Sequence, residues 1–190
     1  MPDYFRAKIG SPIHGDSCFS DTVNSKKRFA MIDPLGHGPQ AHILSQKVCN
    51  SLGSLKKTNV TEVLESINHQ YFKSRGLALS LAIWDKQNAK LEVMGIGNVN
   101  VILISECGVF HFKNIPSYIG HSNSLRVTSH VHKVPKHSKL LMFTDGIKCP
   151  NKFHLNLMRD MNSRHIVQTL AAQWNGQDDV GIFCEALSYE

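Results

Sequence analysis

Five aspartates in this sequence share one local setting, the junction between an apolar, strand-type segment and a glycine-containing loop. They are Asp16, Asp33, Asp145, Asp178 and Asp179. Asp33 ends the run RFAMID, and Asp145 ends the run KLLMFTD. A buried strand can hold side chains at its end rigidly while the loop keeps them accessible. Each acid alone is equally compatible with an ordinary turn, so the meaning of the set depends on whether its members converge.

Converging carboxylates would need partners, because like charges repel. Two unit charges ~4 Å apart repel by about 4 kcal/mol at an effective dielectric constant of 20. Such a cluster must take up protons or bind cations. Aspartate oxygens suit the hard ions Mg²⁺ and Mn²⁺ better than zinc. With one bridging carboxylate, two ions ~3.5–4 Å apart could activate a water for attack on a phosphoryl group.

Strands and helices must position these acids. We expect strands at residues 4–9, 14–22, 28–33, 77–85, 90–95, 99–105, 109–113, 125–134, 139–144 and 180–187. Helices are expected at 39–53, 61–74, 153–161 and 165–174, largely from apolar residues that recur at spacings of three and four. Turn signals between residues 77 and 113 indicate a meander of hairpins, which the strands at 125–134 and 139–144 continue. Because the helices come in blocks, two antiparallel sheets with helices outside them are favoured over a parallel βαβ sheet.

Length and composition indicate one globular domain over residues 1–190. Hydrophobic residues make up 42% and charged residues 19% of the chain, which is typical of a globular protein. The first residues, MPDYFRAKIG, carry charges where a signal peptide is apolar, and no stretch reaches the ~20 apolar residues of a membrane span. The five cysteines form no C-x-x-C pair, which is typical of a reducing compartment. We therefore expect a cytoplasmic protein that does not associate with a membrane.

The net charge of +6 raises the question of a nucleic-acid partner. Lysines and arginines are scattered, however, and the densest loop spans residues 130–139. No helical basic stripe and no aromatic-studded strand accompanies them. The pattern favours a solvated basic surface, or an acidic protein partner, over nucleic-acid binding. It does not indicate an oligomeric state.

Several other residues are secondary candidates. His37 could bind a substrate phosphate or transfer a proton, although it could equally cap or pack the following helix. Asp179 lies beside the main acids, and Asn98 lies in a Gly-x-Gly-Asn turn, where asparagine also serves the backbone. His130 and His132 could share a strand face, but no cysteine or acid stands at a useful spacing for zinc. The sequence has neither a G-x-S-x-G elbow nor a cysteine followed by a phosphate-cradling basic loop, which disfavours a serine or cysteine nucleophile.

The order of five short motifs resembles the metal-dependent PPM-type serine/threonine phosphatases. The motifs are G-D at 15–16, D-x-x-G-H-G at 33–38, G-x-G-N at 95–98, LLMFTDG at 140–146 and DDVGIF at 178–183. The resemblance covers nearly the whole chain and is strongest to the compact bacterial branch of SpoIIE, RsbU and especially RsbX. It implies an α+β fold, a four-layer αββα sandwich of two antiparallel β-sheets flanked by helices, with metals in a cleft at one end.

The resemblance also implies a role for each acid. Asp33 would bridge two ions, Mn²⁺ or Mg²⁺, while Asp16 would bind one ion and Asp145 with Asp178 the other. The family's Asp-Gly motif lends a backbone carbonyl to the metal, and Pro34 occupies that glycine position. Proline keeps the carbonyl, but its ring fixes φ near −65°. The metal site is preserved if the family geometry allows that φ, and weakened if it needs a positive one.

Two functions are therefore open. By resemblance, the protein is a metal-dependent phosphatase that removes phosphate from serine or threonine of a STAS-domain protein, of the RsbS or RsbR type. That reaction would reset a bacterial stress signal in a stressosome or partner-switching circuit. The alternative is a catalytically impaired pseudophosphatase that binds phosphoproteins without hydrolysing them. The proline at position 34 keeps this alternative open.

Overall fold

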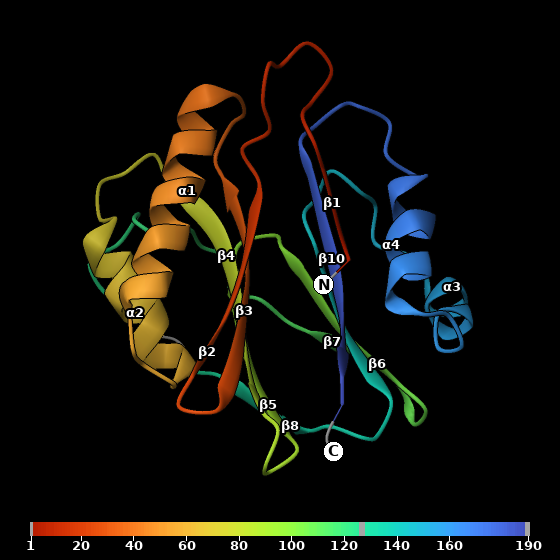
Figure 1. The fold of residues 1–190 in the computed structure, drawn as a ribbon. Helices are drawn as coiled ribbons and strands as arrows, with labels where there is room; N and C mark the ends of the chain where they lie inside the picture. Colours follow the sequence, from red (N-terminus) through yellow and green to blue (C-terminus); the bar gives the residue numbers. More distant parts are fainter. Residues whose placement is uncertain (1, 126–127, 189–190) are drawn as a thin grey trace.

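The computed structural model describes residues 2–125 and 128–188, which form two antiparallel five-stranded sheets (Figure 1). The first sheet contains, in spatial order, β2 (Ser17–Val23), β3 (Lys26–Pro34), β4 (Leu77–Asp85), β5 (Lys90–Ile96) and β8 (His130–Lys133). The second sheet contains, in spatial order, β1 (Asp3–Arg6), β10 (Val180–Leu187), β9 (Ser138–Phe143), β6 (Asn100–Ser105) and β7 (Gly108–Phe112).

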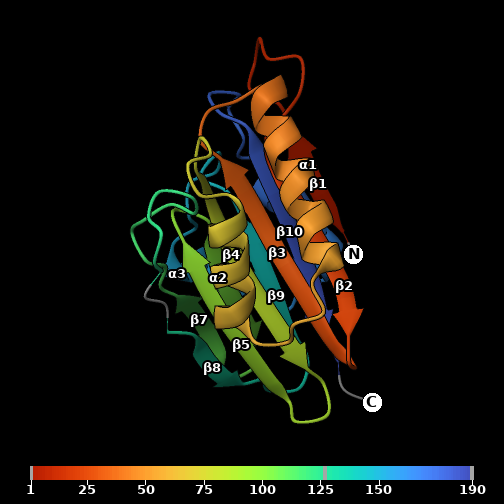
Figure 2. The same cartoon turned by 90° about the vertical axis from the view of Figure 1, so that its left-hand side faces the viewer.

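Helices cover the outer faces of both sheets and give the molecule four layers (Figure 1). The first sheet is covered by α1 (Pro39–Ser54) and α2 (Val60–Gln70), which face the viewer in Figure 2. The second sheet is covered by α3 (Lys152–Leu157) and α4 (Ser163–Ala171). The expected α+β fold, a four-layer αββα sandwich, is therefore confirmed. Within the described ranges, no helix is both long and apolar enough to span a bilayer.

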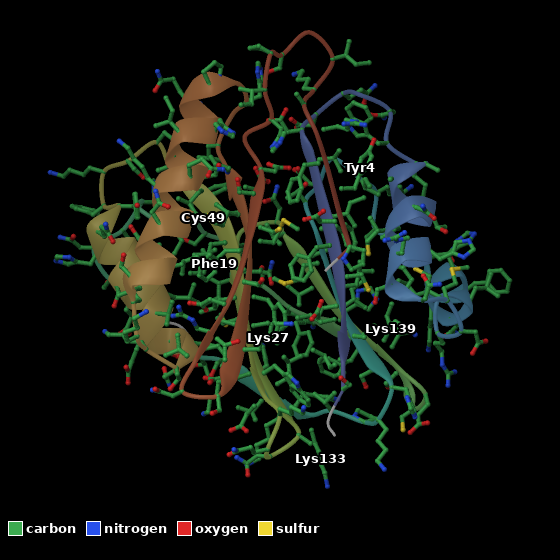
Figure 3. All side chains as sticks on the ribbon, viewed as in Figure 1. Tyr4, Phe19, Lys27, Cys49, Lys133 and Lys139 are labelled. Carbon is green, nitrogen blue, oxygen red and sulfur yellow. The ribbon has the colours of Figure 1, made fainter. Side chains whose placement is uncertain are left out.

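Three apolar layers hold these four layers of structure together. The layer between the sheets includes Phe29 and Phe183, whose ring centroids are 5.9 Å apart. The layer between the first sheet and its helices is extended by Cys49 of α1 and Phe19 of β2, both labelled in Figure 3. The layer under α3 and α4 is extended by Tyr4 of β1. The central strands are thus buried on both faces.

Local sequence explains how the elements begin and why some strands lack alternation. In β4, the residues LALSLAIW are all buried, because one face meets the other sheet and the opposite face meets the helices. Pro39 stands in the first turn of α1, where its missing N–H costs little. The side chains of Asn59 and Asn151 cap α2 and α3 by accepting a backbone N–H.

The element bounds agree closely with the expected ones in the middle and at the end of the chain. The strands at 77–85 and 180–187 have the expected bounds. The strand expected from residue 14 begins only at Ser17, and the preceding residues belong to a loop. In the segment 125–134, the described strand begins at His130, and residues 126–127 lie outside the described residues. The second, third and fourth helices end earlier than expected, at Gln70, Leu157 and Ala171.

The expected meander of hairpins is wrong beyond two separate hairpins, because β8 pairs with β5, and β9 pairs with β6 and β10. β4 pairs with β5 and β6 pairs with β7, but β5 and β6 lie in different sheets. The chain changes sheet through Gly97, whose φ is 94°. A Cβ at this position would lie 2.4 Å from the Cβ of Ala78. The hydrophobic pattern gives the period of a strand but not the sheet it joins, so it could not reveal this crossing.

Candidate metal centre

The five aspartates gather at one end of the sandwich, the upper end in Figure 1. Asp33 lies near the end of β3 and Asp145 follows β9, whereas Asp16 precedes β2, and Asp178 and Asp179 precede β10. All five line a pocket of about 270 Å³. Its lining also includes Pro34, His37 and Asn98. The structure thus brings together the residues that the sequence analysis singled out.

Asp16 is held by a chain of hydrogen bonds that crosses between the sheets. It is 2% exposed, and its Oδ2 accepts a 2.7 Å hydrogen bond from the Thr144 hydroxyl. The same hydroxyl oxygen accepts the N–H of Gly181 at 2.9 Å. The orientation of Asp16 is therefore fixed by the β9–β10 pair.

Pro34 is an extended residue at the end of β3. On the β2 side the pairing stops at Ile32, so the proline lies beyond the last residue of that partner strand, where a missing N–H is tolerated. The left-handed backbone of this loop falls instead on Gly36 and Gly38, with φ of 80° and 78°. The sharp turn is therefore made after the proline, by residues that lack a Cβ.

Asp145 and Asp178 are exposed at the mouth of the pocket. The Asn98 amide donates a 2.6 Å hydrogen bond to Asp145 Oδ2. The indole N–H of Trp174 donates a 2.9 Å bond to the Asp178 carbonyl, which fixes the backbone of this loop. Asp178 Oδ1 accepts the backbone N–H of Asp179 at 2.9 Å.

Asp179 differs from the other acids, because both of its carboxylate oxygens bind backbone. It is 5% exposed, and it accepts the N–H of Lys8 at 2.8 Å and of Gly15 at 2.6 Å. Its own carbonyl lies 2.0 Å from where a Cβ would stand on Gly146. Asp179 therefore ties the loop before β10 to the loop that carries Asp16.

Burial, followed by the charges of neighbouring carboxylates, raises the pKa values of Asp16, Asp33 and Asp145. Burial raises the pKa of Asp33 to about 7, and the charges of Asp145 and Asp178 add to this effect. Burial, followed by the charge of Asp33, raises the pKa of Asp16 well above its usual range. Burial and then Asp178 raise the pKa of Asp145. The ion pairs of the described residues involve other acids, so none of them neutralises this cluster.

The donor chemistry fits a hard divalent cation. The pocket offers carboxylate oxygens and the carbonyl oxygen that Pro34 retains, which suit Mg²⁺ or Mn²⁺. Across the described residues, no three acidic, histidine or cysteine side chains already form a group that could hold an ion. Mg²⁺ usually keeps several waters and takes only one or two carboxylates. Asp145 and Asp178 lie at the exposed mouth of the pocket, so one or two carboxylates could bind such an ion together with its waters, and the residues present fit it.

Three residues of the site were not anticipated from the sequence. Thr144 directly precedes Asp145 in the motif LLMFTDG, so its place beside a candidate acid was a usable signal. Its partner, however, lies 128 residues away. Lys8 and Tyr118 line the pocket from loops, and no local pattern marks them.

The comparisons with known proteins agree with this geometry. Residues 24–184 match the family model of Stage II sporulation protein E (SpoIIE). A crystal structure of RsbX in complex with magnesium superposes with a TM-score of 0.85 and 25% identity, over 98% of this chain and 94% of that one. Comparison with curated proteins finds no match.

Two further structures share the fold. A chain from "The bacterial stressosome: a modular system that has been adapted to control secondary messenger signaling" has a TM-score of 0.85 and 21% identity, with 96% of each chain covered. The PP2C phosphatase domain of SpoIIE from Bacillus subtilis has a TM-score of 0.78 and 21% identity, over 96% of this chain and 61% of that one. With its acid-lined pocket, the fold is that of a PPM-type serine/threonine phosphatase. Within that class, the chain belongs to the SpoIIE family and is similar to RsbX.

Proposed function

We propose that this protein hydrolyses phosphoserine or phosphothreonine in a phosphorylated STAS-domain protein, with bound Mn²⁺ or Mg²⁺. The observation that carries the proposal is a single pocket in which aspartates from both sheets face one another. Within the described residues, no lysine or arginine forms an ion pair with them. The product would be an unphosphorylated protein of the RsbS or RsbR type, and its release would reset a bacterial stress signal.

In this proposal the acids divide between two cation positions. Asp33 would help to hold both cations, Asp16 and the Pro34 carbonyl would help to hold one, and Asp145 with Asp178 the other. The bound cations would activate the attacking water as Lewis acids and neutralise charge on the phosphoryl oxygens. Asp33, Asp145 and Asp178 are thus the proposed catalytic residues.

The remaining residues of the pocket position these ligands. The Thr144 hydroxyl orients Asp16, and the Asn98 amide orients Asp145. Such outer partners matter because the orientation of a ligand contributes to metal affinity. Asp179 holds the loop of Asp16 through Gly15. We assign His37, which is exposed at the rim, to contact with the phosphate.

The comparisons support the substrate class. One similar structure contains RsbX with magnesium, and another is associated with the bacterial stressosome. The net charge of +6 suits encounter with an acidic phosphoprotein. Long-range attraction of this kind is screened by salt, so turnover of such a partner should slow as ionic strength rises.

The decisive experiment measures phosphate release from p-nitrophenyl phosphate and from a phosphothreonine peptide, with EDTA or with added Mn²⁺ or Mg²⁺. We expect metal-dependent turnover that Asp33→Asn lowers by about a hundredfold or more. The matched control is Asp85→Asn, which neutralises an acid at the opposite end of the sandwich and should leave turnover unchanged. Turnover that survives EDTA, or that Asp33→Asn does not reduce, would contradict the proposal.

A binding module that recognises phosphoproteins without hydrolysing them is the second candidate. One observation favours it, which is the proline in the family's glycine position. The same assay separates the candidates when Pro34→Gly is included. If only Pro34→Gly hydrolyses phosphate, the natural chain is the binder.

A further inference from the structure

A second pocket lies beside the aspartate pocket and carries the opposite charge. It has a volume of about 310 Å³ and shares Leu35 and Tyr118 with the aspartate pocket. Its lining includes Lys73, Arg75 and His121, and no carboxylate. The aspartate pocket is lined by five acids. The two pockets therefore form one bipolar surface, divided by the shared side chains.

Arg75 brings its positive charge to the loop that follows Asp33. A Cβ on Gly36 would lie 2.5 Å from the Nη2 atom of Arg75, so the guanidinium occupies the space that the glycine leaves open. The side chain is exposed. Across the described residues, neither Arg75 nor Lys73 forms an ion pair with a carboxylate. The ammonium group of Lys73 lies 5.5 Å from the centroid of the Phe72 ring, which also lines this pocket, so an anion that enters the pocket can reach both cations.

The backbone around this pocket is hydrogen-bonded to the loop that follows Asp33. The N–H of Leu35 donates a 3.0 Å hydrogen bond to the carbonyl of Gly76, and the N–H of Lys73 donates a 2.9 Å bond to the carbonyl of Gly120. Lys73 has a φ of 63°, a conformation that non-glycine residues rarely adopt and that often marks functional sites. The backbone conformation of the turn at Lys73 is thus fixed by hydrogen bonds.

A buried asparagine completes the frame. Asn68 is 2% exposed; its Oδ1 accepts the N–H of Gly120, and its Nδ2 donates to the carbonyl of Ser122, each at 2.8 Å. These bonds attach the wall formed by Tyr118 and His121 to α2. The cationic groups therefore stand on a preorganised support, which lowers the cost of ordering them when a ligand binds.

We propose that this cationic pocket, which carries the charges of Lys73 and Arg75 beside His121, binds an acidic side chain of the phosphoprotein next to its phosphorylated residue. The inference rests on the proposed function, because the aspartate pocket must receive the phosphoryl group. A substrate bound there would pass over Leu35 and Tyr118, and its neighbouring carboxylate would meet Arg75. The pocket thus selects phosphosites with acidic flanks and disfavours basic flanks through charge repulsion.

The test uses two synthetic phosphothreonine peptides that differ only in their flanking residues, glutamate or glutamine. We expect the wild-type protein to favour the glutamate peptide by about fivefold in kcat/KM. Arg75→Gln should reduce this preference to less than about twofold. Lys73→Asn provides an independent second variant, since asparagine tolerates the left-handed backbone at this position. Lys136→Gln is the matched control, because it removes one exposed charge from the loop before β9, at the far end of the sandwich.

Each outcome of this test is informative. An equal loss for both peptides in Arg75→Gln would overturn the inference, since it would place the guanidinium on the phosphoryl group itself. An unchanged preference in both pocket variants, or an equal reduction in the Lys136→Gln control, would overturn it as well. If no peptide is hydrolysed, fluorescence anisotropy measures binding with the same variants. An acidic preference without turnover would contradict the proposed function alone, and turnover without preference would contradict this inference alone.

Discussion

The acidic residues at the two ends of the sandwich have different partners. At the end that carries the β2–β3 hairpin, Asp85 lies 3.5 Å from the ammonium group of Lys26, and Glu185 pairs with Lys27. Nearby, Asp21 pairs with the buried guanidinium of Arg28. At the opposite end, Asp16, Asp33, Asp145 and Asp178 line one pocket. Among the described residues, the acids at the hairpin end thus form ion pairs with Lys26, Lys27 and Arg28, whereas those at the pocket end face one another and form no ion pair.

The pKa values follow this difference. Hydrogen bonds from the Asn88 side chain, followed by smaller effects that include Lys26, lower the pKa of Asp85. Burial and neighbouring carboxylates raise the pKa of Asp33 to about 7. The surroundings of Asp85 thus favour its charged form, whereas those of Asp16, Asp33 and Asp145 disfavour it. An arrangement that is costly without a ligand indicates a binding site rather than a stabilising network.

The largest expected effect is the stabilisation of the pocket end by divalent cations. At a Mg²⁺ or Mn²⁺ concentration of about 100 times Kd, binding to the folded state adds about 2.7 kcal/mol, which should raise Tm by about 5–10 °C. Asp33→Asn should abolish this rise, and Asp85→Asn should preserve it. Differential scanning fluorimetry measures both. An equal rise in all three proteins would place the cations elsewhere.

A change to the hydrogen-bonded support of Asp16 should have the next largest effect. Thr144→Val removes the hydroxyl that serves Asp16 and the N–H of Gly181, and leaves that N–H unpaired in a buried position. We expect a loss of about 1–3 kcal/mol in the free energy of unfolding and a metal affinity that is about tenfold weaker. Urea unfolding and metal titration measure the two effects, and Thr144→Ser should restore the affinity. Unchanged metal affinity in the valine variant would show that Asp16 needs no support.

The pH dependence of the metal-free protein sharpens the comparison further. The unfolded chain releases the Asp33 proton above about pH 4, whereas the folded state retains it until pH approaches 7. The unfolded state therefore binds fewer protons in this interval, and stability falls as pH rises through it. The raised pKa values of Asp16 and Asp145 act in the same direction.

We expect the free energy of unfolding to fall by about 1–2 kcal/mol more in the wild-type protein than in Asp33→Asn between pH 4 and pH 8. Denaturant unfolding in EDTA at several pH values measures this difference. Parallel pH profiles for the two proteins would show that Asp33 ionises normally.

The smallest effect is expected at the hairpin end. Lys26→Gln removes the ion pair with Asp85, whose side chains are 38% and 17% exposed. Exposed pairs of this kind contribute at most about 1 kcal/mol and are screened by salt. We expect a loss of about 0.5 kcal/mol in stability, with no change in metal affinity. If Lys26→Gln lowered the free energy of unfolding more than Thr144→Val does, the expected contrast between the two ends would be wrong.

The sequence predicted the acids of the site better than it predicted their support. Asp33 and Asp145 end long apolar runs, and a buried strand must end at the edge of its sheet. Their convergence could therefore be anticipated from the strand pattern and the resemblance together. Asp179 stood in the sequence as one more acid, but in the structure both of its oxygens bind backbone groups. Local sequence cannot distinguish a carboxylate that accepts backbone N–H groups from one that is free to bind a cation.

Other features depend on contacts between distant segments. The sequence gives no sign that Arg75 lies against Gly36, because this contact arises only when the two loops come together in the fold. The change of sheet at Gly97 was missed because the hydrophobic pattern of a strand does not identify the strand with which it pairs. Local signals did predict the starts of helices, as at Pro39, and the bounds of strongly apolar strands such as β4.

The packing of Phe29 against Phe183 has a consequence well beyond the hydrophobic core. Asp33 extends from one sheet and Asp145 from the other. The coordination of an ion held between them would therefore depend on the distance between the two sheets. Any substitution that lets the sheets slide would loosen coordination without altering a single ligand. The packing between the sheets thus controls the affinity of the pocket for its ions.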